Sequence, residues 1–225
     1  MPRELMIFAA GFGKRMAPLT DTTPKPLIAV GGTTLLDHTL GLAQRAGYGH
    51  IVVNTHYRHA QIAAHLAGRA GVSTTHEPQI LETGGGLAAA AGQFTSPTVT
   101  TSNSDAVWAG PNPFDCPLDL PVDCDAMLLC AHVSQVLGRT GPGDFSIDAN
   151  GHITRGGNYV YLGIQHIRLA PVTAHPETAF SLNVIWDKLI QIGRIRAQLY
   201  TGQWCDVGRP ENIATANRLL AHHDV

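Results

Sequence analysis

Segment 9–26, AAGFGKRMAPLTDTTPKP, contains the densest group of residues suited to chemistry in this chain. Gly11 and Gly13 have no side chain, so the backbone around them can turn tightly and bring its N–H groups close to phosphate oxygens. The same segment carries three of the chain's 15 lysines and arginines, Lys14, Arg15 and Lys25. This combination of glycines and cations predicts a loop that binds a polyphosphate.

Two common phosphate-binding motifs are absent from this loop. A P-loop requires the pattern GxxxxGK[ST], which the segment lacks, and the dinucleotide fingerprint GxGxxG would need glycine where Met16 stands. An NAD-binding oxidoreductase is therefore disfavoured. It is disfavoured further because no acidic residue suited to the ribose follows a clear strand end.

Two aspartates can supply carboxylates to a divalent cation. Asp105 belongs to Asn103-Ser104-Asp105, directly after the apolar strand 98–102, and Asp206 follows Trp204-Cys205. Mg²⁺ prefers one or two carboxylates together with phosphate oxygens and water. No convincing Ser/His/Asp set accompanies them. These aspartates and the nearby cations therefore favour a reaction in which the protein neutralises the charge of two anionic substrates that must meet in line.

The elements around these motifs predict an α/β fold. Segment 5–10 is a buried strand that runs into the first glycine, and strands and helices then alternate with short connections. Such alternation predicts a mostly parallel, doubly wound (Rossmann-like) sheet with helices on both faces. Ligands of these sheets bind beyond the carboxyl ends of the strands, where segments 11–25 and 103–105 both fall. The expected strands are 5–10, 51–55, 72–75 and 98–102, and the expected helices are 35–46, 58–67 and 86–93.

The second half of the chain adds mixed structure to this sheet. A proline-rich stretch at 109–123 is expected to be an irregular loop, and Asn150-Gly151 predicts the turn of a hairpin. Ser181 is a plausible N-cap, and Pro210 suits the first position of a last helix. The expected strands are 126–132, 145–147, 153–155, 159–164 and 195–200, and the expected helix is 181–192.

The motif AAGFGKRMAPLTDTTPKPL resembles the signature of the sugar-1-phosphate nucleotidylyltransferases. The likeness continues through ETGGG at 82–86, NSD at 103–105 and WCDVG at 204–208, and so covers nearly the whole chain. Members of this family join a nucleoside triphosphate to a sugar 1-phosphate and release pyrophosphate. Within the family, ETGGG is most similar to the segment of uridylyltransferases that act on N-acetylmuramate 1-phosphate in cell-wall recycling. The resemblance thus implies transfer of UMP from UTP to that sugar phosphate.

The resemblance assigns a role to each matching motif. Arg15 is expected to hold the transferring or leaving phosphates, Lys25 the α-phosphate, and Asp105 a catalytic Mg²⁺ shared with Asp206. Because a sugar 1-phosphate is already anionic at pH 7, its oxygen needs no strong general base. The expected nucleotide contacts are Ala10, Gly11, Gly13, Lys14, Arg15, Lys25, Glu77, Thr83, Gly84 and Gly85. The expected sugar contacts are Asn103, Asp144, Asn158 and Gly163.

The order of the elements, with no linker that divides them, predicts one nucleotidyltransferase domain over 1–225. Residues 1–108 are expected to form its nucleotide-binding part, and residues 109–225 its sugar-phosphate-binding part, an inserted hairpin-containing lobe that completes the sheet. Two residues depart from the usual pattern. Ser104 replaces a glycine and would place a hydroxyl near the metal, and Arg209 replaces a threonine and would contact substrate or face solvent.

Two other functions remain open on the sequence. One is a guanylyltransferase for mannose or heptose 1-phosphate. The other is a non-catalytic sensor of nucleotide-sugars, which could lose any of the site residues. This chain retains all four of them, Arg15, Lys25, Asp105 and Asp206.

Composition limits the partners and the compartment. The 225 residues include 15 basic and 17 acidic ones, for a net charge of −2, which excludes a protein that covers nucleic acid with positive charge. No apolar run reaches the ~18 residues of a membrane span. The four cysteines form no CxxC pair and suit free thiols in a reducing cytoplasm. We therefore expect a cytoplasmic monomer or small homo-oligomer whose partners are a nucleoside triphosphate and a sugar 1-phosphate, not nucleic acid or a membrane.

Overall fold

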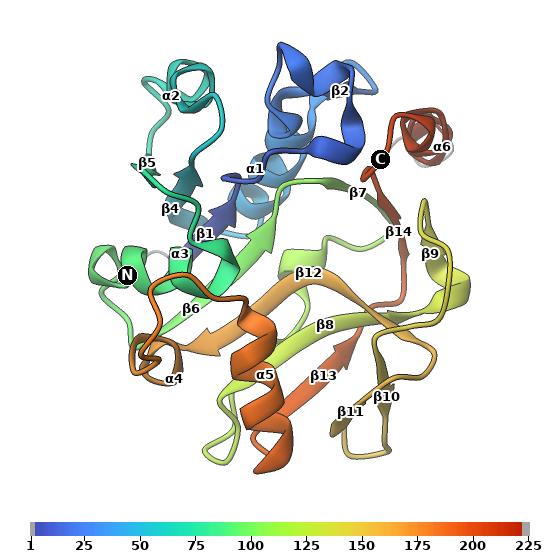
Figure 1. Ribbon diagram of the computed structural model, residues 1–225. Helices are drawn as coiled ribbons and strands as arrows, with labels where there is room; N and C mark the ends of the chain where they lie inside the picture. The colour runs from blue at the N-terminus through green and yellow to red at the C-terminus, as the bar shows by residue number, and fades with distance from the viewer. Residues whose placement is uncertain (1–2, 222–225) are drawn as a thin grey trace.

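A computed structural model describes residues 3–221 and has one large sheet at its centre (Figure 1). Strand β12 is antiparallel to its neighbours β6 and β8, and the other neighbouring pairs of main strands run parallel. The prediction of a mostly parallel α/β sheet is therefore confirmed. The main strands, in spatial order, are β5 (Val72–His76), β4 (Tyr48–Thr55), β1 (Arg3–Phe8), β6 (Thr98–Asn103), β12 (Tyr159–Arg168), β8 (Ala126–His132) and β13 (Ile195–Leu199).

Helices cover both faces of this sheet because side chains alternate along its buried strands. In β1, Leu5 and Ile7 join one hydrophobic core, whereas Met6 joins a second core on the other face. The doubly wound arrangement is confirmed. The helices of the first core are α1 (Leu35–Arg45) and α2 (His59–Leu66), and those of the second are α3 (Glu82–Ala90), α4 (Leu169–Thr173) and α5 (Leu182–Gln191).

A second, three-stranded sheet joins the two halves of the chain. Its strands, in spatial order, are β7 (Ala106–Ala109), β14 (Gln203–Asp206) and β9 (Val136–Leu137). A third core packs Met16 of the glycine-rich segment with Val107 of β7, Cys205 of β14 and Leu219 of the last helix, α6 (Glu211–Ala221). This core also includes Val30 of the small hairpin formed by β2 (Ala29–Val30) and β3 (Thr33–Thr34). The packing holds the predicted phosphate loop against strands from both halves of the chain.

The predicted hairpin at Asn150-Gly151 is confirmed. Strands β10 (Phe145–Ile147) and β11 (Ile153–Arg155) pair antiparallel, and Gly151 has a φ of 82°, which the tight turn requires. The hairpin joins the large sheet through the pairing of Phe145 with Tyr159 of β12. Together with α5 it lies in the lower half of Figure 1, away from β2 and α6.

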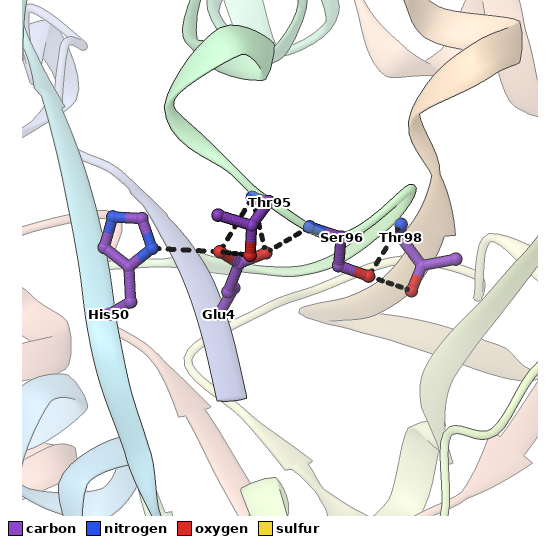
Figure 2. A network of polar contacts seen from close by, with 5 residues as sticks. All are labelled: Glu4, His50, Thr95, Ser96 and Thr98. Atoms are coloured by element: carbon purple, nitrogen blue, oxygen red, sulfur yellow. Dashed lines mark hydrogen bonds and ion pairs between the residues drawn. The ribbon is translucent and has the colours of Figure 1, made fainter. Parts of the chain in front are cut away.

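Glu4 fastens the amino-terminal end of β1 to the turn that precedes β6 (Figure 2). Its carboxylate accepts hydrogen bonds from the N–H groups of Thr95 and Ser96, both at 2.9 Å, and lies 3.0 Å from Nδ1 of His50. Burial by itself would raise the pKa of Glu4, but these hydrogen bonds lower it to about 2. This contact is at the end of the sheet opposite to the carboxyl ends of β1 and β6.

Several boundaries differ from the prediction. Helix α3 begins at Glu82, whereas the predicted helix was 86–93, so the consecutive glycines lie inside it. Strand β1 ends at Phe8, strand β12 continues to Arg168 beyond the predicted end at 164, and α4 was not predicted. Glycine has a low helix propensity, and the packing that keeps α3 helical involves residues far away in the sequence.

Two further features of the described chain concern its helices and its cysteines. No helix within residues 3–221 combines the length and apolarity needed to cross a bilayer. The four cysteines are free thiols, as predicted. Burial raises the pKa of each of these thiols, which disfavours the reactive thiolate.

Candidate active site

Two adjoining cavities open at the carboxyl ends of β1 and β6. The loop-side cavity, about 420 Å³, is lined by segment 8–15 and Lys25, and the lobe-side cavity, about 360 Å³, by residues of the β10–β11 hairpin and the start of α5. Ligands of parallel sheets bind in this position. The residues common to both cavities are Phe8, Arg15, Thr83, Asn103 and Asp105.

The glycine-rich loop covers the loop-side cavity with its backbone. Gly13 has a φ of 65°, and a Cβ there would lie 3.0 Å from Lys25 Cβ and from Thr20 Cγ2, so this position requires glycine. Gly11 lines the cavity and has no atom within 4 Å of the position a Cβ would take. Met16 is fully buried and anchors the loop to the third core, at the position where a dinucleotide fingerprint has glycine.

Lys25 and Asp105 form an ion pair at the edge shared by the two cavities. Lys25 Nζ lies 2.6 Å from Asp105 Oδ2, and Lys25 is only 9% exposed. Lys25 begins a short 3₁₀ turn after Pro24, and Asp105 follows β6. A phosphate entering here would compete with Asp105 for the lysine.

The pairing of β7 with β14 brings the second aspartate beside Asp105. Asp206 is opposite Ala106, and the N–H of Val207 donates to the carbonyl oxygen of Asp105 at 3.0 Å. Burial and the nearby charge of Asp105 raise the pKa of Asp206, while Lys25 and Arg15 act in the opposite direction. Two neighbouring carboxylates fit Mg²⁺, which takes one or two carboxylates beside phosphate oxygens. Within residues 3–221, no group of three or more His, Cys, Asp or Glu side chains is arranged to hold a metal.

The turn between β6 and β7 is fixed by short hydrogen bonds and close packing. Ser104 is buried, and its hydroxyl donates to the carbonyl oxygen of Phe8 at 2.7 Å. The extra hydroxyl that distinguishes Ser104 from glycine therefore ties Asp105 to the end of β1. Gly163 of β12 has a φ of 86°, and a Cβ there would lie 3.1 Å from Cβ of Asn103. Gly163 thus leaves room for Asn103, which lines both cavities.

The lobe-side cavity contains a neutralised pair of charges. Arg139 donates to both carboxylate oxygens of Asp144, at 3.0 and 2.6 Å. Asp144 Oδ2 also accepts the N–H of Tyr161 at 3.0 Å. The hydrogen bond and charge of Asp144 raise the pKa of Arg139. This pair is therefore held in place at one wall of the cavity.

Aromatic side chains form another wall of the same cavity. The ring centroids of Tyr161 and Trp186 lie 4.8 Å apart in an edge-to-face arrangement. Trp186 Nε1 donates to Gln165 Oε1 at 2.9 Å, which fixes the indole ring. The guanidinium of Arg155 lies over the rings of Phe145 and Trp186, with its Cζ 5.0 and 5.8 Å from their centroids.

Comparison with known proteins identifies the family. Residues 5–115 match the model of the MobA-like NTP transferase domain. The chain is 33% identical to the N-acetylmuramate alpha-1-phosphate uridylyltransferase of Caulobacter vibrioides, over 98% of both chains. It is 32% identical to the protein of the same name from Neisseria meningitidis serogroup B, over 96% of this chain and 97% of the relative. The chain belongs to the sugar-1-phosphate nucleotidylyltransferase family.

A solved structure of low sequence identity has the same fold. The inositol-1-phosphate CTP transferase from T. maritima superposes with a TM-score of 0.79 at 14% identity, over 99% of this chain and 98% of that one. The predicted family and the predicted Rossmann-like fold are both confirmed. The protein is accordingly a nucleotidyltransferase, and it transfers a nucleotidyl group to a sugar 1-phosphate.

The nucleotidylyltransferase fold brings most of the predicted site residues to the two cavities. Seven predicted nucleotide contacts line the loop-side cavity: Ala10, Gly11, Gly13, Lys14, Arg15, Lys25 and Thr83. Asn103 and Asp105 line both cavities, and Asp144 and Asp206 line the lobe-side cavity. Residues that are far apart in the sequence thus meet at one edge of the sheet.

Glu77, a predicted nucleotide contact, lies behind Asn54 and does not line either cavity. It is buried, and its carboxylate accepts hydrogen bonds from Asn54 Nδ2 at 2.7 Å and from the N–H of Leu81 at 3.1 Å. Asn54 Oδ1 in turn accepts the N–H of Ala9 at 2.8 Å. Glu77 therefore positions Asn54, which lines the loop-side cavity and fixes the start of the glycine-rich loop.

Gly84 and Gly85, predicted nucleotide contacts, lie in α3 against segment 178–180. Their N–H groups both donate to the carbonyl oxygen of Phe180, at 2.8 and 3.0 Å. A Cβ on Gly84 would overlap the ring of Phe180, and a Cβ on Gly85 would overlap the carbonyl oxygen of Thr178. These glycines let segment 178–180 pack closely on α3, and neither lines a cavity. Thr83, just before them, does line both cavities, and its hydroxyl accepts the N–H of Leu182 at 3.0 Å.

Three further residues lie outside both cavities, namely the predicted sugar contacts Asn158 and Gly163, and Arg209. Asn158, a predicted sugar contact, is exposed, and its carbonyl oxygen accepts the N–H of Val133 at 2.9 Å. Arg209 is exposed and lines neither cavity, whereas Gly208 beside it lines the loop-side cavity.

The sequence analysis missed several cavity residues. Asn54 is the penultimate residue of the buried strand β4, near the strand end where ligand sites are typical. Arg139 and Arg155 precede the glycine-containing stretches TGPG and GGN, a pattern of cation and glycine that resembles the phosphate loop. Ile80 and Phe12 are partly exposed apolar residues at the loop-side cavity, and nothing local in the sequence distinguishes them.

Proposed function

We propose that this protein transfers UMP from UTP to N-acetylmuramate 1-phosphate, forming the UDP-sugar and pyrophosphate. The observation that carries the proposal is the convergence of Arg15, Lys25, Asp105 and Asp206 at the shared edge of two cavities. The full-length likeness to two uridylyltransferases of that name supports the choice of base and sugar. Because UTP is supplied in the cytoplasm, we place the reaction there, as part of peptidoglycan recycling.

The proposed reaction needs two anionic substrates to meet in line. An oxygen of the sugar 1-phosphate attacks the α-phosphorus of UTP, and the bond to the pyrophosphate oxygen breaks. The attacking oxygen is already anionic at pH 7, so no side chain has to remove a proton. The protein's task is to orient both groups and to neutralise their charge.

Arg15 and Lys25 suit this task by position. Arg15 lines both cavities, so its guanidinium can bind phosphate oxygens at the junction of the two substrates. Lys25 lines the loop-side cavity and can turn from Asp105 to the α-phosphate when UTP enters. Gly11, which borders open space in the loop-side cavity, leaves room for the remaining phosphates.

We further propose that Asp105 and Asp206 hold Mg²⁺. Their adjacency across β7 and β14, and the raised pKa of Asp206, support a site that gains from a divalent cation. When bound, the metal would neutralise negative charge on the phosphates of both substrates. Gly208 supports this arrangement, because a Cβ there would lie 2.8 Å from Asp206 Oδ2 and crowd the carboxylate.

A matrix of substrates tests the proposal. Pyrophosphate release is measured with UTP, dTTP, GTP and ATP against N-acetylmuramate, N-acetylglucosamine and mannose 1-phosphates. We expect UTP with N-acetylmuramate 1-phosphate to be preferred over GTP by at least roughly tenfold, or ~1.4 kcal/mol. A preference for GTP with mannose 1-phosphate would establish the guanylyltransferase alternative, and no turnover with any pair would favour the sensor.

A further inference from the structure

The lobe-side cavity contains a cation to which the proposed transfer assigns no role. Arg155 ends β11, and its guanidinium packs over the rings of Phe145 and Trp186. Arg155 Nε donates to Asp187 Oδ1 at 2.7 Å, and Nη2 donates to the carbonyl oxygen of Asn183 at 3.3 Å. The aromatic rings and the start of α5 therefore hold the guanidinium in a defined orientation.

Arg155 retains capacity to bind an anion. Its side chain is 39% exposed, and no residue of the described chain, 3–221, accepts a hydrogen bond from its Nη1. Its partner Asp187 is 54% exposed and does not line the cavity, so this ion pair is screened by solvent. A carboxylate that enters the cavity can thus bind the free edge of the guanidinium.

The other arginines of the cavity are less suited to a second anion. Arg139 already donates to both oxygens of Asp144, which the N–H of Tyr161 also holds. Arg15 belongs to the glycine-rich loop and lines the junction with the loop-side cavity, where the phosphates are placed. Arg155 instead belongs to the hairpin and is tied to α5, both in the lower half of Figure 1, whereas α6, which follows Asp206, lies in the upper half.

We propose that Arg155 binds a carboxylate on the sugar ring of the acceptor and thereby selects an acidic amino-sugar phosphate over a neutral one. This inference rests on the proposed function, since N-acetylmuramate carries a lactyl carboxylate on C3 and N-acetylglucosamine carries a hydroxyl there. The phosphate on C1 and the carboxylate on C3 leave different ring carbons and need separate cations. Guanidinium binds carboxylate through paired, charge-assisted hydrogen bonds, and such contacts discriminate strongly because an unpaired partner is costly.

Steady-state kinetics with two acceptors test the assignment. UTP is held at saturation, and kcat/KM is measured for N-acetylmuramate 1-phosphate and for N-acetylglucosamine 1-phosphate, which lacks only the lactyl group. In Arg155→Met, whose side chain still packs on Phe145 and Trp186, we expect kcat/KM for the acidic acceptor to fall roughly 10- to 100-fold, mainly through KM. For the neutral acceptor we expect a change of less than about threefold. Arg155→Lys should recover part of the preference because it retains the charge.

Arg196→Gln is the matched control. Arg196 also pairs with an exposed aspartate, Asp123, at 2.6 Å, but it lies on β13 and lines neither cavity. Arg196→Gln should leave kcat/KM for both acceptors unchanged. Raising the salt concentration should reduce the preference of the wild type for the acidic acceptor and leave that of Arg155→Met unaffected.

The outcomes separate this inference from the proposed function. Suppose that the wild type uses UTP and N-acetylmuramate 1-phosphate. If Arg155→Met then lowers kcat/KM equally for both acceptors, or for neither, the carboxylate assignment is wrong and the proposed function stands. If the wild type fails to use the acidic acceptor, or prefers the neutral one, both are overturned. A selective loss that Lys partly restores supports the assignment.

Discussion

The sequence predicts that Gly11 and Gly84 both contact the nucleotide, but the two glycines have opposite surroundings in the structure. A Cβ on Gly11 would enter open space beside the loop-side cavity, whereas a Cβ on Gly84 would overlap the ring of Phe180. Substituting each glycine by alanine should therefore separate affinity from stability. Gly11→Ala should lose UTP affinity in a stable protein, and Gly84→Ala should lose stability while the folded fraction retains UTP affinity.

The size of each effect follows from the local packing. Overpacking a core costs about 1–3 kcal/mol, and replacing glycine by alanine in a helix returns up to about 1 kcal/mol. Phe180 is only 3% exposed and cannot move aside freely, so the cost should lie at the upper end of that range, about 3 kcal/mol. After the gain in helix propensity, we expect Gly84→Ala to lose about 2 kcal/mol of stability. For a domain of this size that corresponds to a fall in Tm of roughly 4–8 °C. Gly11→Ala should change Tm by less than about 1 °C and lower kcat/KM for UTP by about tenfold or more.

The assays are thermal unfolding and initial rates of pyrophosphate release at 20 °C. Gly92→Ala serves as the control, because Gly92 is exposed and has no atom within 4 Å of a Cβ position, and it lies outside both cavities. Gly92→Ala should change neither Tm nor rate. A Gly84→Ala variant with a normal Tm and a large loss of kcat/KM for UTP would refute the reasoning, because it would show that Gly84 contacts the nucleotide. A normal kcat/KM for UTP in Gly11→Ala would show that the phosphates of UTP do not bind beside Gly11.

Three further predictions follow from the site and the fold. Asp105→Asn should reduce pyrophosphate release at least about 100-fold at limiting Mg²⁺ without unfolding the protein, and near-normal turnover would exclude Asp105 as a ligand. Arg15→Ala should lower kcat more than it raises KM for the sugar phosphate, because charge builds on the departing pyrophosphate; a loss confined to that KM would assign Arg15 to the acceptor. The pKa of Glu4 is about 2 in the folded protein against an ordinary value of 4.5, so its stabilisation is complete above pH 4.5 and is lost as the pH falls toward 2. Urea unfolding of Glu4→Gln should therefore show lower stability at neutral pH and a weaker dependence on pH between 4.5 and 2, and parallel pH curves for the variant and wild type would contradict it.

Local chemistry in the sequence determined much of this protein. Alternating apolar strands and helices predicted the doubly wound sheet, and Asn150-Gly151 predicted the hairpin, because backbone propensity and side-chain periodicity act over a few residues. The glycines and cations of segment 9–26 predicted the lining of the loop-side cavity for the same reason. Gly13 needs its positive φ within a local turn, and a short stretch of sequence is enough to indicate that.

Tertiary structure alone decided which of these residues meet. Asp206 lies beside Asp105 because β14 pairs with β7, and Arg155 reaches the lobe-side cavity because the hairpin docks against α5. Gly11 and Gly84 are the same residue type in similar motifs, yet one borders open space and the other borders Phe180. The physical reason is that access to a cavity depends on which distant side chains fill the space around a residue. Local sequence specifies the conformation of a segment, and long-range packing specifies what that segment faces.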